Sequence, residues 1–347
     1  MHKKNSILSK NLNKNNRSIE NLYYQNLIKD SYSHYNLDNS FIVFTSINNI
    51  LYLIYSTKNL SIISYNLIDN IKINEIKNAH EMYITNFRHY SDGENKRDLF
   101  ISISSENNNI KLWNINNWEL LYNYESINKV GELYSACFLQ NNSDNFIITS
   151  NSHLFNTENI KVFDFYGNKL NEINESNYNT FIIETYFDKK SKINYIITGN
   201  YGYITSFDFQ NNKFYQKYDD GINTLKRKMY NHFFIYETEG SIKIISSGND
   251  GNIRIWEFHS SNLLIKLKIV NKSLGGICFF CNENLYCGCE DTEIKIIDIK
   301  IGKIIKCLKG HYKEVINIKK INHPKYKECL ISQGLYKDYI KIWIKKN

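Results

Sequence analysis

Four cysteines lie close together near residue 280, and thiolates are ligands that zinc favours. Cys278 and Cys281 form a C-x-x-C pair, and Cys287 and Cys289 follow shortly after them. Zinc is held by tetrahedral thiolate sites, and paired cysteines also serve in redox chemistry. The competing interpretation is that these thiols are small apolar side chains packed in a core. The elements that position them decide between the two.

Two histidines could act as general acids or bases, because each lies near a carboxylate in the sequence. His80 is followed by Glu81, and His311 is three residues from Glu314. Histidine is the side chain most often used for proton transfer near neutral pH. However, the sequence contains no G-x-S-x-G, G-x-x-x-x-G-K-[ST], H-E-x-x-H or G-x-G-x-x-G motif. We therefore expect no catalytic site, no cofactor and no metal.

Basic side chains outnumber acidic ones, which raises the question of nucleic-acid binding. The 347 residues include 43 Lys and Arg against 35 Asp and Glu, a formal net charge of +8. Five of the basic residues precede the first acid, Glu20, so the rest of the chain carries +8 − 5 = +3. That charge is weak for a surface that must hold phosphates. Two further basic runs, 226–228 and 319–320, are expected on opposite faces of the repeat described below, so they form no single track.

The basic N-terminal segment, residues 1–18, is poor in acids and fits two interpretations. It could be an organellar targeting signal or a solvated leader, and we favour the leader. No apolar run follows it as in a secretory signal, and the longest apolar stretch, 41–55, is too short and interrupted to cross a membrane. Seven cysteines, an odd number, then predict reduced thiols in an intracellular protein, cytoplasmic or nuclear.

One type of segment recurs seven times and fills most of the chain. It consists of a turn, a short β-branched run, a bulky residue and usually Asp, Asn or Glu, as in Ile253-Arg254-Ile255-Trp256-Glu257. The bulky positions are 65, 113, 163, 207, 256, 297 and 343, separated by 41 to 50 residues. A repeat of this length indicates one architecture of repeated units rather than several unrelated domains.

Each repeat contains four short strand-like runs, and no sustained helical stripe is present. In the first unit the runs are about 41–46, 50–55, 60–66 and 71–77, separated by turn residues. Four strands in each of seven repeats predict an all-β, seven-bladed β-propeller that forms one domain over residues 19–347. The last repeat ends after its third strand, and residues 20–28 have strand composition. We therefore expect residues 20–28 to supply the missing outer strand and close the ring.

Residues 38–347 resemble the WD-repeat family of β-propellers. The resemblance rests on the segment 248–257 and on Gly310-His311 followed by Trp343. In that family a His before the first strand, a Ser or Thr on the second, an Asp in the next turn and the Trp form a structural hydrogen-bonded network. The resemblance implies this role for His80, Asn107, Trp113, Ser246, Asp250, Trp256, Asp291, His311, Ser332, Asp338 and Trp343. Units one, three and four depart from the pattern.

The repeat also bears on the cysteines. It puts Cys278 on the innermost strand, and Cys287 and Cys289 at positions just before the Asp291 turn. WD-repeat proteins commonly have Ser, Ala or Gly there, because strands of neighbouring blades converge near the axis. Cysteine behaves as a small apolar residue in such places. We therefore favour packing over a metal or redox site.

The resemblance implies a rigid disc that binds other proteins rather than converting a substrate. We expect a monomeric disc that acts as a non-catalytic scaffold within a multiprotein complex. The family's usual contact face is formed by the loops that enter each first strand. By position, those loops contain Met82, Lys272 and Lys313, with Lys226, Arg227 and Lys228 nearby. The alternative is an RNA-associated assembly factor that uses the basic tail and loops, which predicts steeply salt-dependent binding.

Overall fold

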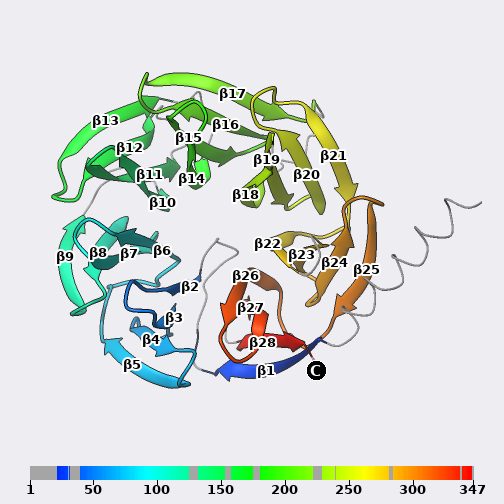
Figure 1. Ribbon diagram of the computed structural model, residues 1–347, viewed down its shortest axis with the longest axis horizontal. Coiled ribbons are helices and arrows are strands. Elements are labelled where there is room, and N and C mark those ends of the chain that lie inside the picture. The colour runs from blue at the N-terminus through cyan, green and yellow to red at the C-terminus, as the bar shows by residue number, and fades with distance from the viewer. Residues whose placement is uncertain are drawn as a thin grey trace, which may run out of the picture.

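The computed structural model describes residues 22–29, 31, 40–124, 132–152, 158–174, 180–221, 229–238, 240–280, 284–336 and 338–345. In these ranges the chain forms twenty-eight strands and no helix. The strands make seven antiparallel sheets of four, arranged as blades around a central axis (Figure 1). The prediction of an all-β, seven-bladed propeller is confirmed. Nowhere in the described ranges is there a helix long and apolar enough to cross a membrane. The segment 1–18 lies outside them.

The first three blades follow one another along the chain, each running from the axis outward. Blade 1 comprises β2 (Phe41–Thr45), β3 (Leu51–Ser56), β4 (Ile62–Asn66) and β5 (Ile71–Ile76). Blade 2 comprises β6 (Asn86–Asp92), β7 (Arg97–Ser104), β8 (Asn109–Asn114) and β9 (Glu119–Tyr124). Blade 3 comprises β10 (Glu132–Asn141), β11 (Asp144–Ser152), β12 (Glu158–Asp164) and β13 (Lys169–Asn174).

The remaining blades repeat the pattern, and the last one borrows a strand. Blade 4 comprises β14 (Thr180–Asp188), β15 (Ile193–Asn200), β16 (Tyr203–Asp208) and β17 (Lys213–Asp219). Blade 5 comprises β18 (Tyr230–Thr238), β19 (Ser241–Gly248), β20 (Asn252–Glu257) and β21 (Leu263–Lys268). Blade 6 comprises β22 (Leu274–Phe280), β23 (Asn284–Cys289), β24 (Ile294–Asp298) and β25 (Lys303–Leu308). Blade 7 comprises β26 (Val315–His323), β27 (Lys327–Gly334), β28 (Ile340–Lys345) and β1 (Leu22–Ile28).

The repeated segment forms the third strand of every blade. In blades 1 to 6 the pairing of the third and fourth strands shifts register just before the bulky repeat residue, for example between Leu112 and Trp113. A β-bulge increases the local twist of a strand, so each outer strand turns along the rim of the disc. In blade 7 no hairpin joins β28 to β1, and Tyr24 pairs with Trp343 without a shift at that point.

Strand β1 closes the ring as predicted. It pairs antiparallel with β28, from Leu22 opposite Lys345 to Ile28 opposite Ile340 (Figure 1). The Lys341 ammonium donates a hydrogen bond to Asn26 Oδ1 of β1 over 3.2 Å. The N-terminal strand thus covers the edge that β28 would otherwise leave unpaired.

The hydrophobic core is divided among the interfaces between blades. Seven clusters of buried side chains each combine residues from two neighbouring blades. The cluster between blades 7 and 1 contains Ile331 and Phe41 together with Ile28 of β1. Because a four-stranded sheet buries its faces only against its neighbours, the ring is stabilised as a whole when it closes.

Candidate partner-binding surfaces

Blade 7 contains a continuous buried network of polar side chains. His311 lies 2.9 Å from Asp338 through Nδ1 and 2.7 Å from Ser332 Oγ through Nε2. The Trp343 indole N–H donates to the same Ser332 oxygen over 2.7 Å. Asp338 also accepts bonds from the backbone N–H groups of residues 312 and 313. The network thereby ties the loop that enters the first strand to the second and third strands.

The protonation states in this network follow from burial. Burial lowers the pKa of His311, and the hydrogen bond to Asp338 offsets this only in part, so the imidazole is neutral at pH 7. Burial opposes ionisation of Asp338, but its bonds from His311 and the backbone hold the pKa of this carboxyl at about 2. The donors therefore run from the Trp343 indole through Ser332 and His311 to an ionised Asp338, which leaves no free base.

Blade 2 has only part of this network. His80 Nε2 lies 2.7 Å from Ser102 Oγ, which also accepts the Trp113 indole N–H over 2.8 Å. The Asn107 side-chain oxygen, expected to take the place of the turn Asp, accepts no hydrogen bond in the described structure, and His80 Nδ1 is likewise unpaired there. Burial, with a smaller effect of Lys111, lowers the pKa of His80 to about 3. The hydrogen bond expected at the Asn107 oxygen is therefore absent from the described structure, and the role of Asn107 in the network stays a prediction. Ser102 was not among the residues predicted for this network.

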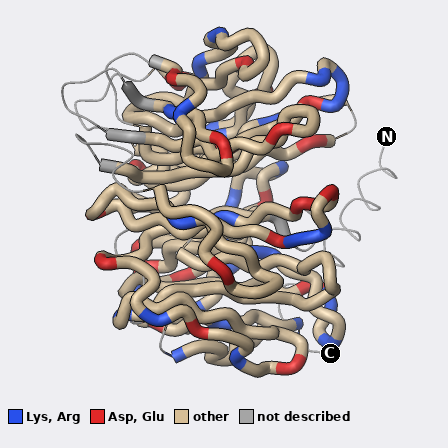
Figure 2. The backbone as a smooth tube through the Cα atoms, turned by 90° about the vertical axis from the view of Figure 1, so that its left-hand side faces the viewer, with Lys and Arg blue, Asp and Glu red and all other residues tan. Residues whose placement is uncertain are grey.

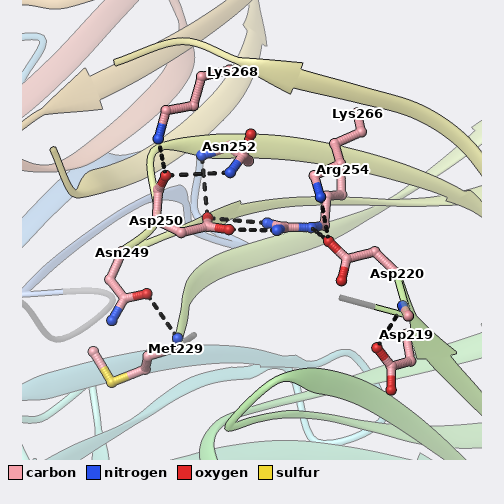
Figure 3. A network of polar contacts seen from close by, with 10 residues as sticks. Asp219, Asp220, Met229, Asn249, Asp250, Asn252, Arg254, Lys266 and Lys268 are labelled. Carbon is pink, nitrogen blue, oxygen red and sulfur yellow. Dashed lines mark hydrogen bonds and ion pairs between the residues drawn. The ribbon is translucent and has the colours of Figure 1, made fainter. Parts of the chain in front are cut away.

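Blade 5 replaces the network with an ionic cluster, shown in Figure 3. The Ser246 hydroxyl and the Trp256 indole N–H form no hydrogen bond within the described residues, so the expected bond between them is absent. Instead, the buried Arg254 guanidinium binds Asp250 at 2.5 Å and Asp220 at 2.9 Å. Lys266 adds a second cation on Asp220 at 2.8 Å. Burial opposes ionisation of Asp250, but Arg254 lowers the pKa of this carboxyl overall.

Gly251 completes the turn in blade 5. Its φ of +72° is a conformation that glycine adopts without strain. A Cβ at this position would also overlap the Val270 carbonyl oxygen. The Asp250-Gly251 turn is therefore fixed by backbone geometry as well as by the ion pair with Arg254.

A basic residue in the middle of the third strand recurs in several blades. In blade 6, Lys295 lies 2.8 Å from Asp291 and also contacts Glu293. In blade 7, the fully buried Lys341 lies 3.6 Å from Asp338. In blade 2, Lys111 donates to the Ala79 carbonyl over 2.7 Å. The sequence repeat already contains this basic residue, since the residue after its first Ile is Lys or Arg in five units. These cations were nevertheless not among the residues predicted for the networks.

Four of the described cysteines are buried, whereas Cys278 and Cys307 are partly exposed. Cys287 and Cys289 are buried on β23, and burial raises the pKa of Cys287 well above its usual value. Gly288 lies between them, and a Cβ there would overlap the Val315 backbone of blade 7. Blades 6 and 7 therefore approach closely at these small residues. Cys281 lies outside the described residues, and the described ones include no cluster of three or more potential metal ligands.

The predicted contact residues lie in loops that enter first strands. Met82 is 41% exposed in the loop before blade 2, and the Lys272 side chain is 57% exposed before blade 6. Lys313 is exposed before blade 7, next to Tyr312, which is 73% exposed. The basic run Lys226, Arg227 and Lys228 lies outside the described residues.

Two of these residues are brought to one place by the ring. A small cavity of about 10 Å³ between blades 5, 6 and 7 is lined by Ser273, Glu290 and Glu314. Lys272 directly precedes Ser273, and its ammonium lies 3.7 Å from Glu290. Lys313 directly precedes Glu314. The surface around this cavity, which we call the mouth between blades 5, 6 and 7, therefore carries both cations and carboxylates. Met82 belongs to a loop two blades away from Lys313 in ring order.

A larger hollow lies elsewhere, between blades 2 and 3. It has a volume of about 630 Å³ and is lined by Leu112, Leu121, Phe146, Phe165, Tyr166 and Leu170, with polar groups at its edges. We call it the blade 2–3 groove. Sequence analysis missed it, because its walls come from turns and outer strands of two units that share no motif.

The charged residues of the disc are mixed rather than segregated. Seen edge-on, with blades 2 and 3 toward the viewer, Lys and Arg positions are interspersed with Asp and Glu positions (Figure 2). Several basic side chains are engaged in ion pairs, such as Lys320 with Glu328 at 2.5 Å. Lys319 and Lys320 lie within the strand β26.

No protein-family model matches this chain, and no curated protein matches its sequence. The functional interpretation therefore depends on the propeller and the surfaces described above.

Proposed function

We propose that this chain is a WD-repeat protein that acts as a non-catalytic scaffold for other proteins. The observation that carries the proposal is the closed ring of seven blades, which holds exposed loop residues on a rigid frame. The network of His311, Asp338 and Trp343 supports the assignment to the WD-repeat family. Fold alone does not determine a binding site, so the contact face must be tested separately.

The contact face we propose is that of the loops containing Met82, Lys272 and Lys313. These side chains are exposed, and the mouth between blades 5, 6 and 7 offers both signs of charge. A mixed rim of this kind favours a protein partner over a polyanion, since it can pair with complementary charges of either sign. The buried histidines support a non-catalytic role, because their ring nitrogens face Ser332, Ser102 and Asp338 rather than solvent.

The test is affinity purification from native extract with the intact chain and with a triple variant, Met82→Glu, Lys272→Glu and Lys313→Glu. The matched control carries Ile68→Glu, Lys189→Glu and Lys190→Glu, the same chemical changes in turns of the opposite face. We expect a stable protein partner that is lost only with the first triple. A partner retained by that variant would contradict the proposed face, and no partner for either protein would contradict the scaffold.

The RNA-associated alternative makes a separate prediction. Recovery of RNA, with binding that falls steeply between low and moderate salt, would support it. The described charges do not favour this alternative, because cations such as Lys266 and Lys295 are already paired with carboxylates.

A further inference from the structure

The blade 2–3 groove is built on contacts that hold its walls in place. The turn of blade 3 packs against β9 of blade 2, where a Cβ at Gly167 would overlap the Tyr122 ring. The Tyr124 hydroxyl donates to the Asp164 carbonyl over 3.0 Å, and the Tyr90 hydroxyl donates to Asn145 over 2.5 Å. Both bonds cross from blade 2 to blade 3. The groove is therefore formed before any ligand binds, which reduces the entropic cost of binding.

The lining of the groove is apolar in its depth and exposed at its rim. Leu112 is buried at the floor, and Phe146 and Phe165 are partly exposed in the walls. At the rim, Tyr166 is 79% exposed and Leu170 is 53% exposed. Tyrosine is enriched among the side chains that contribute most to binding energy at protein interfaces. The volume of about 630 Å³ accommodates one or two bulky side chains of a bound segment.

The charges around the groove select the partner. The Arg97 guanidinium is compensated by Asp92, with Nε and the carboxylate oxygen 2.8 Å apart. Asp164 turns its carboxylate toward the N–H groups of its own turn. The Asp144 carboxylate is exposed and has no hydrogen-bond or ion-pair partner among the described residues. The lining therefore carries an excess of negative charge, and Asp144 is the group available to a ligand cation.

We propose that the blade 2–3 groove binds an extended segment of a partner protein that carries a bulky apolar side chain next to a lysine or arginine. The apolar side chain would enter between Phe146 and Leu170, and the cation would pair with Asp144. This inference rests on the proposed scaffold function and adds a second surface, on the face opposite the loops that contain Lys272 and Lys313.

The probe is a phage-displayed library of random dodecapeptides, panned against the immobilised full chain. Enriched peptides are then synthesised with a fluorescent label, and their binding is measured by fluorescence polarisation. The groove variant is Tyr166→Ser with Leu170→Glu, and the matched control is Phe214→Ser with Leu264→Glu, two exposed positions on blades 4 and 5. A separate variant, Asp144→Lys, tests the charge.

We expect enriched peptides with a bulky apolar residue adjacent to Lys or Arg. The groove variant should weaken their binding by about tenfold or more, since loss of a hot spot has that effect. Asp144→Lys should weaken it by about fivefold or more through the reversed charge. The control variant should bind as the intact chain does.

Three results would overturn the proposal. The enriched peptides could be insensitive to the groove variant, they could be acidic, or sedimentation could show self-association that the groove variant abolishes, which would make a second copy the occupant. The panning uses peptides and leaves Met82, Lys272 and Lys313 intact. Any of these results would therefore leave the scaffold proposal unchanged. Failure of the affinity purification would likewise leave the peptide result standing.

Discussion

Blades 7 and 5 are equivalent repeats of the ring, but they stabilise the turn between their second and third strands by different chemistry. In blade 7 a neutral His311 links Ser332 to the carboxylate of Asp338. In blade 5 the Ser246 hydroxyl has no hydrogen-bond partner among the described residues, and the buried Arg254 binds Asp250 directly. In both blades the turn aspartate is ionised and anchored. The fold thus requires a fixed turn at this position, and either a histidine or a cation on the third strand can fix it.

The largest effect on the free energy of unfolding should come from the ionic cluster around Arg254 in blade 5. Arg254→Met removes one cation from the buried Asp220 and removes the ion-pair partner of Asp250. Breaking one side of a buried ion pair costs about 3–5 kcal/mol, because a charge remains without compensation. We expect the free energy of unfolding in urea to fall by that amount. Lys268→Met is the control, since within the described ranges this exposed side chain donates to the Asp250 carbonyl and forms no ion pair. A loss below about 1 kcal/mol for Arg254→Met would be inconsistent with the cluster as described.

The histidine networks of blades 7 and 2 should contribute less to the free energy of unfolding, and blade 7 should contribute more than blade 2. His311→Ala removes bonds to Asp338 and Ser332, whereas His80→Ala removes the bond to Ser102 and, among the described residues, no bond to a carboxylate. Both substitutions leave a similar cavity, so the difference between them reports the bond to the carboxylate. We expect His311→Ala to cost about 1–2 kcal/mol more than His80→Ala in urea unfolding. Equal losses would mean that Asp338 gains nothing from the histidine.

Acid should destabilise the fold through the buried His80 at a pH where Asp338 still contributes its full stabilisation. The pKa of His80 is about 3 in the fold and about 6.5 when unfolded, so the unfolded chain binds more protons between these values. Stability is therefore lost as pH falls below 6.5, by about 2 kcal/mol at pH 5 for this residue. The pKa of Asp338 is about 2, below its ordinary value of 3.8, so its contribution is lost only as pH falls from about 4 toward 2.

Urea unfolding of the intact chain and of His80→Gln between pH 7.5 and 4 measures this dependence. The variant should show a shallower loss of stability with acid than the intact chain. Identical slopes for the two proteins would show that His80 does not titrate with the predicted shift.

Much of the fold could be predicted from the sequence because the repeat has a period and the strands alternate. The first unit was expected at 41–46, 50–55, 60–66 and 71–77, and its strands lie within about two residues of those limits. The closing strand followed from a missing fourth strand. The polar networks were harder, because they depend on residues from different strands. Ser102 and the Arg254 cluster are contacts between strands that no local pattern specifies, and the groove depends on how two blades meet.

Our central claim is that exposed loop residues bind the partner, whereas the buried ionic cluster stabilises the fold. One paired measurement tests this claim most directly. Partner capture and urea unfolding are compared for the Met82→Glu, Lys272→Glu, Lys313→Glu variant and for Arg254→Met, at a temperature where circular dichroism shows both folded. We predict that the exposed triple unfolds within about 0.5 kcal/mol per site of the intact chain but loses the partner. Arg254→Met should be strongly destabilised and still capture it. The opposite pattern, capture by the triple variant and none by folded Arg254→Met, would contradict the account.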